Sequence, residues 1–273
     1  MKPAPFDYVR PDDVPAAIRA LADGDVIAKV IAGGQSLGPA LNLRLAQPER
    51  LVDIRRIGAL GEVTETADSV LFGACITHAA IEDGRVPDAT GGFMQRVAMD
   101  IAYRAVRTRG TIGGSLSHAD PAADWISALT LLSAVVVIEG PEGRREVGIE
   151  DFVTGPFDTQ LGPADILVGV RIPRLSARAR WSYYKFCRKP GEFAEAIAAV
   201  LFDQNRGISR AVIGATNGAP HVIAQADFLT KGFDAAQAHA AVDASGAGDD
   251  PYERQVHFAA LQRAASQLAA VQA

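Results

Sequence analysis

The sequence predicts an α+β protein, and three features of its patterning support this class. Up to residue 57, short apolar runs alternate with helical patterns, which is typical of a small α/β unit with parallel strands. Between residues 58 and 174, strand-like segments face each other across short turns, which favours a mixed or antiparallel sheet. From residue 175 onward, closely spaced strands precede an alanine-rich helical stretch. We therefore expect two linked subdomains, 1–57 and 58–174, and a small C-terminal α+β domain, 175–273.

The N-terminal unit is expected to alternate strands and helices. Its elements, in order, are a strand at 5–11, a helix ending at Leu21, a strand at 28–32, a helix at 40–44 and a strand at 51–54. Asp12 or Asp13 can cap the first helix through its carboxylate. The strand at 28–32 leads directly into two glycines, so the chain turns sharply where this strand ends.

The rest of the chain is expected to combine hairpins with helices. The second subdomain should contain a hairpin about Ala67-Asp68, a helix at 77–82, a buried helix running into a buried strand at 127–138, a hairpin over 135–149 and a strand at 166–173. The C-terminal domain should contain a linker at 175–180, an antiparallel meander of strands at 181–186, 196–203 and 208–215, and helices from 224 interrupted by a loop at 244–251. The first turn of the helix that carries Asp124 is expected to start at Asp120-Pro121.

Composition and charge exclude several classes of function. The net charge is −5 and both signs are interspersed, so no basic stripe for nucleic acid is present. The start of the sequence lacks the apolar segment of a signal peptide, and the most apolar stretch, 127–138, is too short to span a bilayer. We therefore expect no membrane insertion, and a cytoplasmic location by default.

The cysteines and histidines give no metal-binding pattern. Cys75 and Cys187 lie far apart, so this chain cannot supply the four thiolates of a usual [2Fe–2S] cluster. The five histidines show no H-E-x-x-H spacing. We expect no metal in this chain and no catalytic acid–base pair or nucleophile.

The first unusual motif is VIAGGQSLG at 30–38, where an apolar strand breaks on two glycines. A Rossmann fingerprint needs glycines at the first, third and sixth places of G-x-G-x-x-G. With Gly33 first, the third place is Gln35, and with Gly34 first it is Ser36, so neither frame fits. The turn nevertheless brings bare backbone N–H groups close to a potential ligand.

The second unusual motif is RTRGTIGGSLSHADPAAD at 107–124. Gly113 and Gly114 permit a close backbone approach, and free N–H groups at a helix start form a site for a phosphate or pyrophosphate. Each motif alone is more often just a tight turn. The pair matters more, because two such turns can grip one long ligand that contains two phosphates.

With both motifs in view, the chain resembles the flavin subunit, or medium chain, of the molybdenum hydroxylases, the family of xanthine dehydrogenase and carbon monoxide dehydrogenase. The similarity runs from FDYVRP through AGGQSLGPALNLRLAQPERLVDI, FGACITHAAIE, RGTIGGSLSHADPAAD and ILVGVRIP to YYKFCRKPGEFAEAIAAV, and the tail looks like the closing helix of the family. The segment before that tail is looser and shorter than in the family. This resemblance implies a two-part FAD-binding domain of the vanillyl-alcohol oxidase type followed by a small C-terminal domain.

The resemblance also implies which residues hold FAD. In the first turn, Ala32–Ser36 would wrap the pyrophosphate, bordered by Val30, Ile31 and Leu37; in the second, Thr111, Ile112, Gly113, Gly114 and Ser115 would form the opposite wall. The full set of cofactor-binding residues is Val30, Ile31, Ala32, Gly33, Gly34, Gln35, Ser36, Leu37, Ile101, Thr111, Gly113, Gly114, Ser115, Asp124, Leu167 and Lys185. Asp124 would accept a hydrogen bond from a cofactor hydroxyl, Leu167 would pack near the adenine, Ile101 would lie beside the cofactor, and Lys185 would reach the isoalloxazine or its ribityl chain.

Alternatives stay open for several of these side chains. Lys185 can equally be a solvated lysine beside a strand, and Asp124 can be a helix-capping carboxylate. His78 and His118 are expected to be structural groups and not bases. Tyr183 and Tyr184 alternate in a strand, so one should face inward, but the sequence leaves its contact with the flavin undecided.

By the resemblance, this chain is the FAD-carrying electron-transfer subunit of a molybdenum-containing hydroxylase. A large subunit would hold the molybdenum cofactor and a small subunit two [2Fe–2S] clusters, in a dimer of heterotrimers. One FAD should bind here without a covalent link, and docking should use apolar groups such as Phe258 and Leu261. The alternatives are a stand-alone FAD oxidoreductase and a flavin-free scaffold. The substrate and the electron acceptor are not encoded in any motif.

Overall fold

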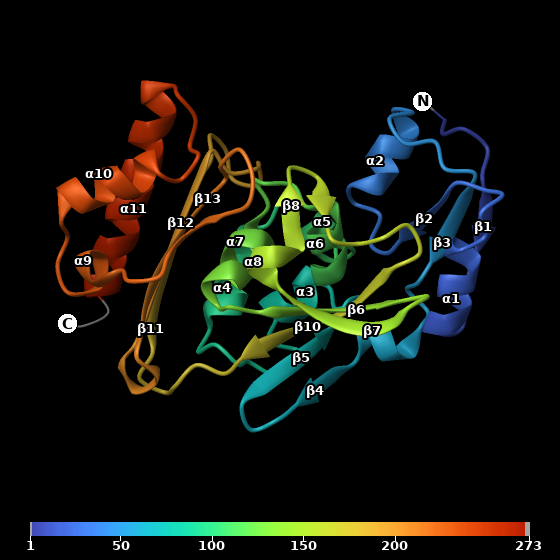
Figure 1. Ribbon diagram of the computed structural model, residues 1–273, viewed down its shortest axis with the longest axis horizontal. Coiled ribbons are helices and arrows are strands. Elements are labelled where there is room, and N and C mark those ends of the chain that lie inside the picture. The colour runs from blue at the N-terminus through green and yellow to red at the C-terminus, as the bar shows by residue number, and fades with distance from the viewer. Residues whose placement is uncertain (1, 271–273) are drawn as a thin grey trace.

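The computed structural model describes residues 2–270, and three larger sheets follow one another along the chain (Figure 1). The N-terminal unit lies at one end of the molecule, the second sheet and its helices lie in the middle, and the third sheet with its helices lies at the other end (Figure 1). This mixture of a parallel sheet, an antiparallel sheet and a helix-backed meander is the α+β arrangement that the sequence predicts.

The N-terminal sheet is parallel, with β3 between β1 and β2. Its elements are β1 (Asp7–Val9), α1 (Val14–Leu21), β2 (Ala28–Ile31), α2 (Leu37–Asn42) and β3 (Arg50–Asp53). The Asp13 carboxylate caps α1 by accepting a hydrogen bond of 2.7 Å from the Ala16 amide. Because β2 and β3 run parallel, the glycine turn after β2 and the end of β3 lie at the same edge of this sheet.

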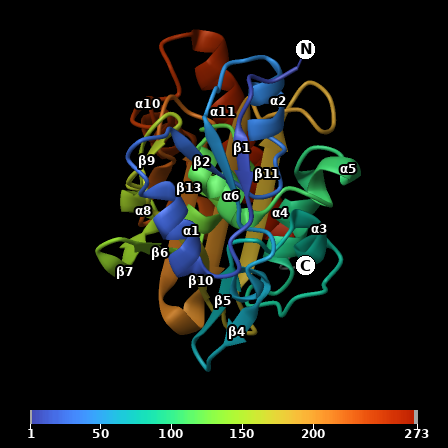
Figure 2. The same cartoon turned by 90° about the vertical axis from the view of Figure 1, so that its right-hand side faces the viewer.

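The second sheet is antiparallel in the order β4-β5-β10-β6-β7. Its strands are β4 (Val63–Glu65), β5 (Ser69–Gly73), β6 (Val135–Gly140), β7 (Gly143–Gly148) and β10 (Ile166–Pro173), and the small pair β8 (Val153–Gly155) and β9 (Asp158–Thr159) lies outside it. The associated helices are α3 (His78–Glu82), α4 (Phe93–Asp100), α5 (Arg104–Arg107), α6 (Ile112–His118), α7 (Asp124–Leu131) and α8 (Ile149–Phe152). In both cartoon views α6 lies toward the N-terminal unit (Figure 2).

The third sheet is an antiparallel meander in the order β11-β12-β13-β14. Its elements are β11 (Arg180–Phe186), β12 (Ala196–Asp203), β13 (Ile208–Gly214), β14 (His221–Ile223), α9 (Asp227–Thr230), α10 (Ala235–Asp243) and α11 (Pro251–Ala270). One face contacts α7, and the other contacts α11 (Figure 1). Because both faces are covered, successive residues of β11 enter two different hydrophobic cores.

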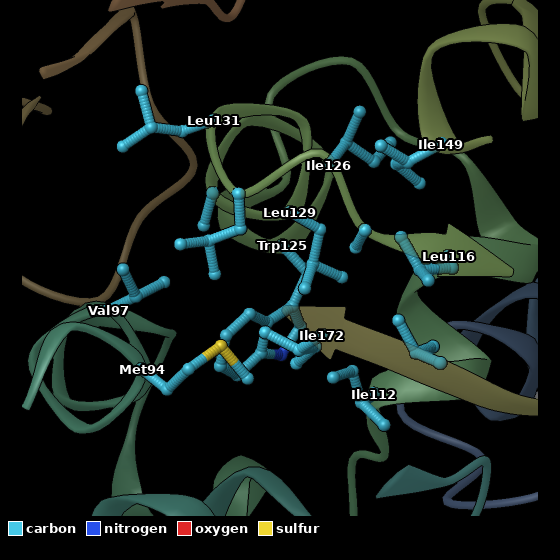
Figure 3. Close-up of a cluster of buried hydrophobic side chains, with 14 of the residues drawn as sticks. Met94, Val97, Ile112, Leu116, Trp125, Ile126, Leu129, Leu131, Ile149 and Ile172 are labelled. Atoms are coloured by element: carbon cyan, nitrogen blue, oxygen red, sulfur yellow. The ribbon is translucent and has the colours of Figure 1, made fainter. Parts of the chain in front are cut away.

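The largest core lies between the second and third sheets and is centred on α7. Trp125, Ile126 and Leu129 are fully buried there, and Ile112 and Leu116 of α6 pack beside them (Figure 3). Separate clusters hold α11 against the third sheet and α1 against the N-terminal sheet. The middle core therefore fixes α6 and α7 relative to the third sheet.

Two expectations about element boundaries are wrong. Helix α2 begins at Leu37 and not at residue 40, because Pro39 falls in the first turn of the helix, where its missing N–H costs nothing. Helix α7 begins at Asp124, since the Asp120 carboxylate accepts a hydrogen bond from the Ala122 amide and closes a turn there. The second glycine motif lies at a helix start, as expected, with Gly113 and Gly114 in the first turn of α6 (Ile112–His118).

The expectation that Leu261 forms an exposed docking surface is also wrong. Leu261 is fully buried because small residues along α11 let the helix lie close to the third sheet. Phe258 is half-buried, and its ring stacks on His239 with centroids 3.9 Å apart. Both side chains therefore serve the internal packing of the C-terminal domain.

Candidate functional site

The first glycine turn leaves its backbone donors unused. The amides of Gly33, Gly34, Gln35 and Ser36 donate no hydrogen bond to any of the residues that the structure describes. The oxygens are engaged instead: Gly33 accepts from the Gln35 side-chain amide, and Gly34 accepts from the Gly38 amide. Gly34 has a φ of +72°, which explains the glycine at this position. A run of backbone N–H groups without acceptors at the edge of a sheet is suited to bind a phosphate.

The two glycine motifs touch each other through their backbones. A Cβ on Gly33 would lie 2.0 Å from the Arg109 carbonyl oxygen and 2.8 Å from the Gly110 Cα. Such distances leave no room for a side chain, and the obstructing atoms are backbone, which cannot swing aside. Ala32 also lies close to Gly114, since a Cβ there would be 4.0 Å from the Ala32 Cβ. Two segments far apart in the chain therefore form one site, the double glycine turn, with a wall on each side.

The second motif does not offer the free amides that the sequence suggested. The amides of Ile112 and Gly113 donate to the carbonyls of Ile76 and Ala74, both at 3.0 Å. The Gly114 amide donates to the Thr111 hydroxyl at 3.1 Å, which caps α6, and the Ser115 amide donates to the Thr111 carbonyl. The interpretation of this motif as a set of free N–H donors is therefore wrong, and any anion donors must come mainly from the first turn.

Gly113 serves the close packing of α6. A Cβ on Gly113 would lie 2.6 Å from the Ala74 Cβ and 2.8 Å from the Ala74 carbonyl oxygen. The glycine thus allows α6 to dock against the segment that follows β5. Gly33, Gly113 and Gly114 are required by contacts within the protein, with a Cβ on Gly114 lying 2.8 Å from the Thr111 hydroxyl, whereas Gly34 is required by its own backbone conformation.

A buried pair, His78 and Trp125, packs against the second motif. The Trp125 indole N–H donates to His78 Nδ1 at 2.9 Å, and the His78 amide donates to the Gly110 carbonyl at 3.0 Å. The His78 ring leaves no space for a side chain on Gly110, where a Cβ would meet it at 2.8 Å. Burial, with a smaller effect from the charge of Arg107, lowers the pKa of His78 to about 4. His78 is thus a neutral structural group, as the sequence suggested.

We expect His78 to make the protein less stable in mild acid. Its folded pKa of about 4 lies below the unfolded value of 6.5, so the unfolded chain binds the proton more readily between these two pH values. The stabilising contribution is complete above pH 6.5 and falls by about 3 kcal/mol as the pH drops to 4. His78→Gln keeps an acceptor for Trp125 but does not titrate. The free energies of unfolding of the wild type and His78→Gln, obtained from denaturation curves, should therefore approach each other as the pH falls. A constant difference between the two proteins at all pH values would contradict the assignment. His118→Gln is the control, because His118 is exposed.

A buried ionic cluster joins the third sheet to the start of α7. The Lys185 ammonium donates to Asp124 Oδ2 at 2.9 Å and to the Asp100 carbonyl at 3.0 Å. The Tyr183 hydroxyl donates to Asp124 Oδ1 at 2.7 Å. The Lys185 and Asp124 side chains are only 4% and 5% exposed, so the alternative of a solvated lysine is wrong.

Burial dominates the electrostatics of this cluster. It raises the pKa of the Asp124 carboxyl, while the charge of Lys185 and the hydrogen bond from Tyr183 oppose that rise. It also raises the pKa of the Tyr183 phenol well above its usual value, helped by the neighbouring Asp124. Asp124 therefore depends on Lys185 and Tyr183 to remain charged inside the protein.

The structure places the other predicted site residues at different depths. Val30 and Ile31 end β2, and Leu37 begins α2. Ser115 lies in the first turn of α6, so all four residues border the double glycine turn. Ile101 follows α4 next to Asp100, whose carbonyl contacts Lys185. Leu167 is 3% exposed and belongs to the middle core on β10.

Sequence reasoning left Tyr183 undecided and missed the pairing of His78 with Trp125. The period-two alternation of β11 contained part of the signal, because Tyr183 and Lys185 are two residues apart and must share a face. The partners on α3 and α7 are remote in sequence, and no local pattern could have revealed them.

Metal and thiol chemistry find no support in the described part of the chain. No group of three or more potential ligands among His, Cys, Asp and Glu gathers there. Burial raises the pKa of the Cys75 thiol to about 12, which makes this cysteine an inert core group. None of the helices within residues 2–270 combines the length and the hydrophobicity that a membrane span requires.

Comparisons with known proteins converge on one family. The model of the "FAD binding domain in molybdopterin dehydrogenase" matches residues 4–175. The 6-hydroxypseudooxynicotine dehydrogenase complex subunit alpha of Paenarthrobacter nicotinovorans is 36% identical over 97% of this chain and 91% of that protein. The carbon monoxide dehydrogenase medium chain of Hydrogenophaga pseudoflava is 34% identical over 93% of this chain and 90% of that protein.

Solved structures agree with the sequence comparisons. A chain in the structure of carbon monoxide dehydrogenase from Hydrogenophaga pseudoflava superposes with a TM-score of 0.90 at 32% identity, covering 99% of both chains. A chain of quinoline 2-oxidoreductase from Pseudomonas putida 86 gives a TM-score of 0.85 at 29% identity, again covering 99% of both chains. These matches confirm the predicted fold over its whole length.

Proposed function

The chain belongs to the family that carries the FAD-binding domain of molybdopterin dehydrogenases, and on this premise we propose that the double glycine turn holds the pyrophosphate of FAD. The protein is the FAD-carrying electron-transfer subunit of a molybdenum-containing oxidoreductase complex. The observation that carries the proposed site is the contact of Gly33 with Arg109, which brings the unspent amides of the first turn against the second motif.

The proposed roles of the two turns differ. The amides of Gly33–Ser36 supply the donors for the pyrophosphate, since nothing in the described chain uses them. The second motif, with Thr111, Gly113, Gly114 and Ser115, supplies a rigid wall whose own amides are already satisfied. Val30, Ile31, Ala32 and Leu37 border the first turn, and Ile101 and Leu167 are proposed to pack against the rest of the cofactor.

Lys185 and Asp124 are proposed to act at the flavin end of the site. FAD, when bound, supplies the electron-carrying chemistry, taking up electrons from iron–sulfur clusters and giving them to an acceptor. A fixed cation near the ring stabilises the negative charge of reduced flavin. Lys185 is proposed to be this cation, and the proposal is supported by Asp124 and the Asp100 carbonyl, which hold its ammonium group in a fixed, buried position.

The proposed partners are subunits that carry the other redox centres. Cys75 and Cys187 are both free, and two thiols cannot hold a [2Fe–2S] cluster of the usual kind. Because related chains are named medium chains or medium subunits, we propose that the molybdenum cofactor and the iron–sulfur clusters reside on a large and a small partner subunit. We propose a dimer of heterotrimers in the cytoplasm, and we propose domain boundaries at residues 57 and 174, between the successive sheets.

The cofactor assignment is tested on the complex purified through a tag on this subunit. Acid precipitation should release one FAD per chain into the supernatant, because no His or Cys stands at the expected flavin-linking place of either turn. Metal analysis should find molybdenum and iron in the complex, and neither metal in this subunit after separation. FMN, or flavin that stays with the precipitate, would contradict the proposed site.

A stand-alone FAD oxidoreductase is the alternative. It predicts that the substrate of the complex reduces the flavin of the separated subunit directly. The electron-transfer role predicts reduction only after the molybdenum and iron–sulfur subunits are added back. Stopped-flow absorbance at the flavin band distinguishes the two outcomes.

A further inference from the structure

The side chains of β11 fall on two sides of the third sheet, and the two adjacent tyrosines have different partners. Tyr183 is 2% exposed and reaches Asp124 at the start of α7. Tyr184 faces the α11 side, where its hydroxyl accepts a hydrogen bond from Arg263. One strand thus carries a buried tyrosine in the ionic cluster and a matched tyrosine outside it.

Tyr183 is held rigidly. Its ring meets Phe93 edge-on, with centroids 6.1 Å apart, and its backbone pairs with Ala199 in the sheet. Its hydroxyl donates a hydrogen bond to Asp124 Oδ1, while the Lys185 ammonium group donates to Asp124 Oδ2. Each carboxylate oxygen is therefore bound to a different side chain of the same strand, and the carboxylate cannot rotate without losing one of these bonds.

The ammonium group of Lys185 has one more donor than these contacts use. An ammonium carries three N–H donors. Two acceptors among the described residues lie within hydrogen-bond distance, Asp124 Oδ2 and the Asp100 carbonyl. The Asp100 carboxylate does not compete, because it pairs with Arg96 at 2.6 Å. One N–H of Lys185 is thus available for a ligand.

We propose that Tyr183 is a positioning residue, which fixes the Asp124 carboxylate so that Lys185 keeps its third N–H directed to bound FAD. This inference rests on the proposed function, in which Lys185 lies at the flavin end of the site. Without the phenol, Asp124 is free to turn both oxygens toward the ammonium group. Lys185 is then drawn to Asp124, its charge is more fully neutralised, and reduced flavin loses stabilisation.

The test compares Tyr183→Phe with Tyr184→Phe in the purified complex. We expect Tyr183→Phe to keep its FAD but to shift the equilibrium between oxidised and reduced flavin about tenfold toward the oxidised form, which is about 30 mV for a two-electron couple. Tyr184→Phe should leave the flavin potential unchanged. A redox titration with mediators, followed at the flavin band, measures both, and the external reductant supplies the two electrons.

A mutant cycle shows whether Tyr183 acts through Lys185. In a Lys185→Met background, adding Tyr183→Phe should produce no further shift of the flavin potential. An equal shift with and without Lys185 would overturn the proposal, and so would identical potentials for Tyr183→Phe and Tyr184→Phe. If the wild-type complex holds no FAD, the proposed function itself fails, which is a different outcome.

A second variant covers the case in which Tyr183→Phe does not fold. Site-specific fluorotyrosine at position 183 keeps the ring and strengthens the phenol as a donor. It should move the flavin potential upward, the opposite direction to Tyr183→Phe. Fluorotyrosine at position 184 is the control, and an unchanged potential at position 183 would contradict the role of the phenol.

Discussion

Gly33→Val is expected to abolish FAD binding and to destabilise the fold. The added Cβ would lie 2.0 Å from the Arg109 carbonyl oxygen and 2.6 Å from its carbon, so the two glycine turns must separate. Forcing extra groups into a packed contact costs about 3 kcal/mol, which corresponds to roughly a hundredfold change in an equilibrium constant. Because the turns form the site together, their separation should remove the pyrophosphate site before it unfolds the chain.

Gly38→Ala is the matched control for this variant. Gly38 lies in α2 only five positions further along the same motif, and a Cβ there would meet no atom within 4 Å. Alanine in a helix is more favourable than glycine by roughly 0.5–1 kcal/mol, so this variant should bind FAD normally and melt slightly higher. Flavin absorbance per chain and thermal melting measure both effects. Full flavin occupancy in Gly33→Val would show that the two turns do not form one site.

The order of elements could be predicted because each local signal agrees with its neighbours. The Asp13 cap of α1, the hairpin turns of β4–β5 and β6–β7, and the alternation of β11 are all encoded within a few residues. Local sequence signals therefore sufficed to predict these elements. The same reasoning placed the start of α7 too early, since Asp120-Pro121 is a good helix start but closes a turn instead.

The site could be predicted only as two separate motifs. Nothing local to VIAGGQSLG shows that Gly33 touches Arg109, because that contact depends on how α6 docks against β5 and the N-terminal sheet. The partners of the Ile112 and Gly113 amides were hidden for the same reason, as their acceptors lie on the Ala74–Ile76 segment. Pairing across long sequence distances is set by tertiary packing.

Lys185→Met is expected to be the most destabilising single change in the ionic cluster. It leaves the Asp124 carboxylate, 5% exposed, without the cation that compensates its burial. Removing one partner of a buried ion pair costs about 3–5 kcal/mol. The exposed control is Lys231→Met, whose pair with Asp227 involves side chains 62% and 52% exposed and should cost at most about 1 kcal/mol. Guanidinium denaturation of the apo chains provides both values.

The pH dependence of Lys185→Met identifies the cause of this loss. Burial already raises the pKa of Asp124, and removing Lys185 raises it further above the unfolded value of 3.8. The folded variant then binds a proton more readily than the unfolded chain, so its stability falls as the pH rises through that interval. Lys185→Met should therefore lose more stability at pH 8 than at pH 5. Adding Asp124→Asn should remove this pH dependence and recover part of the loss, whereas an equal loss at both pH values would place its origin in packing instead of in the stranded carboxylate.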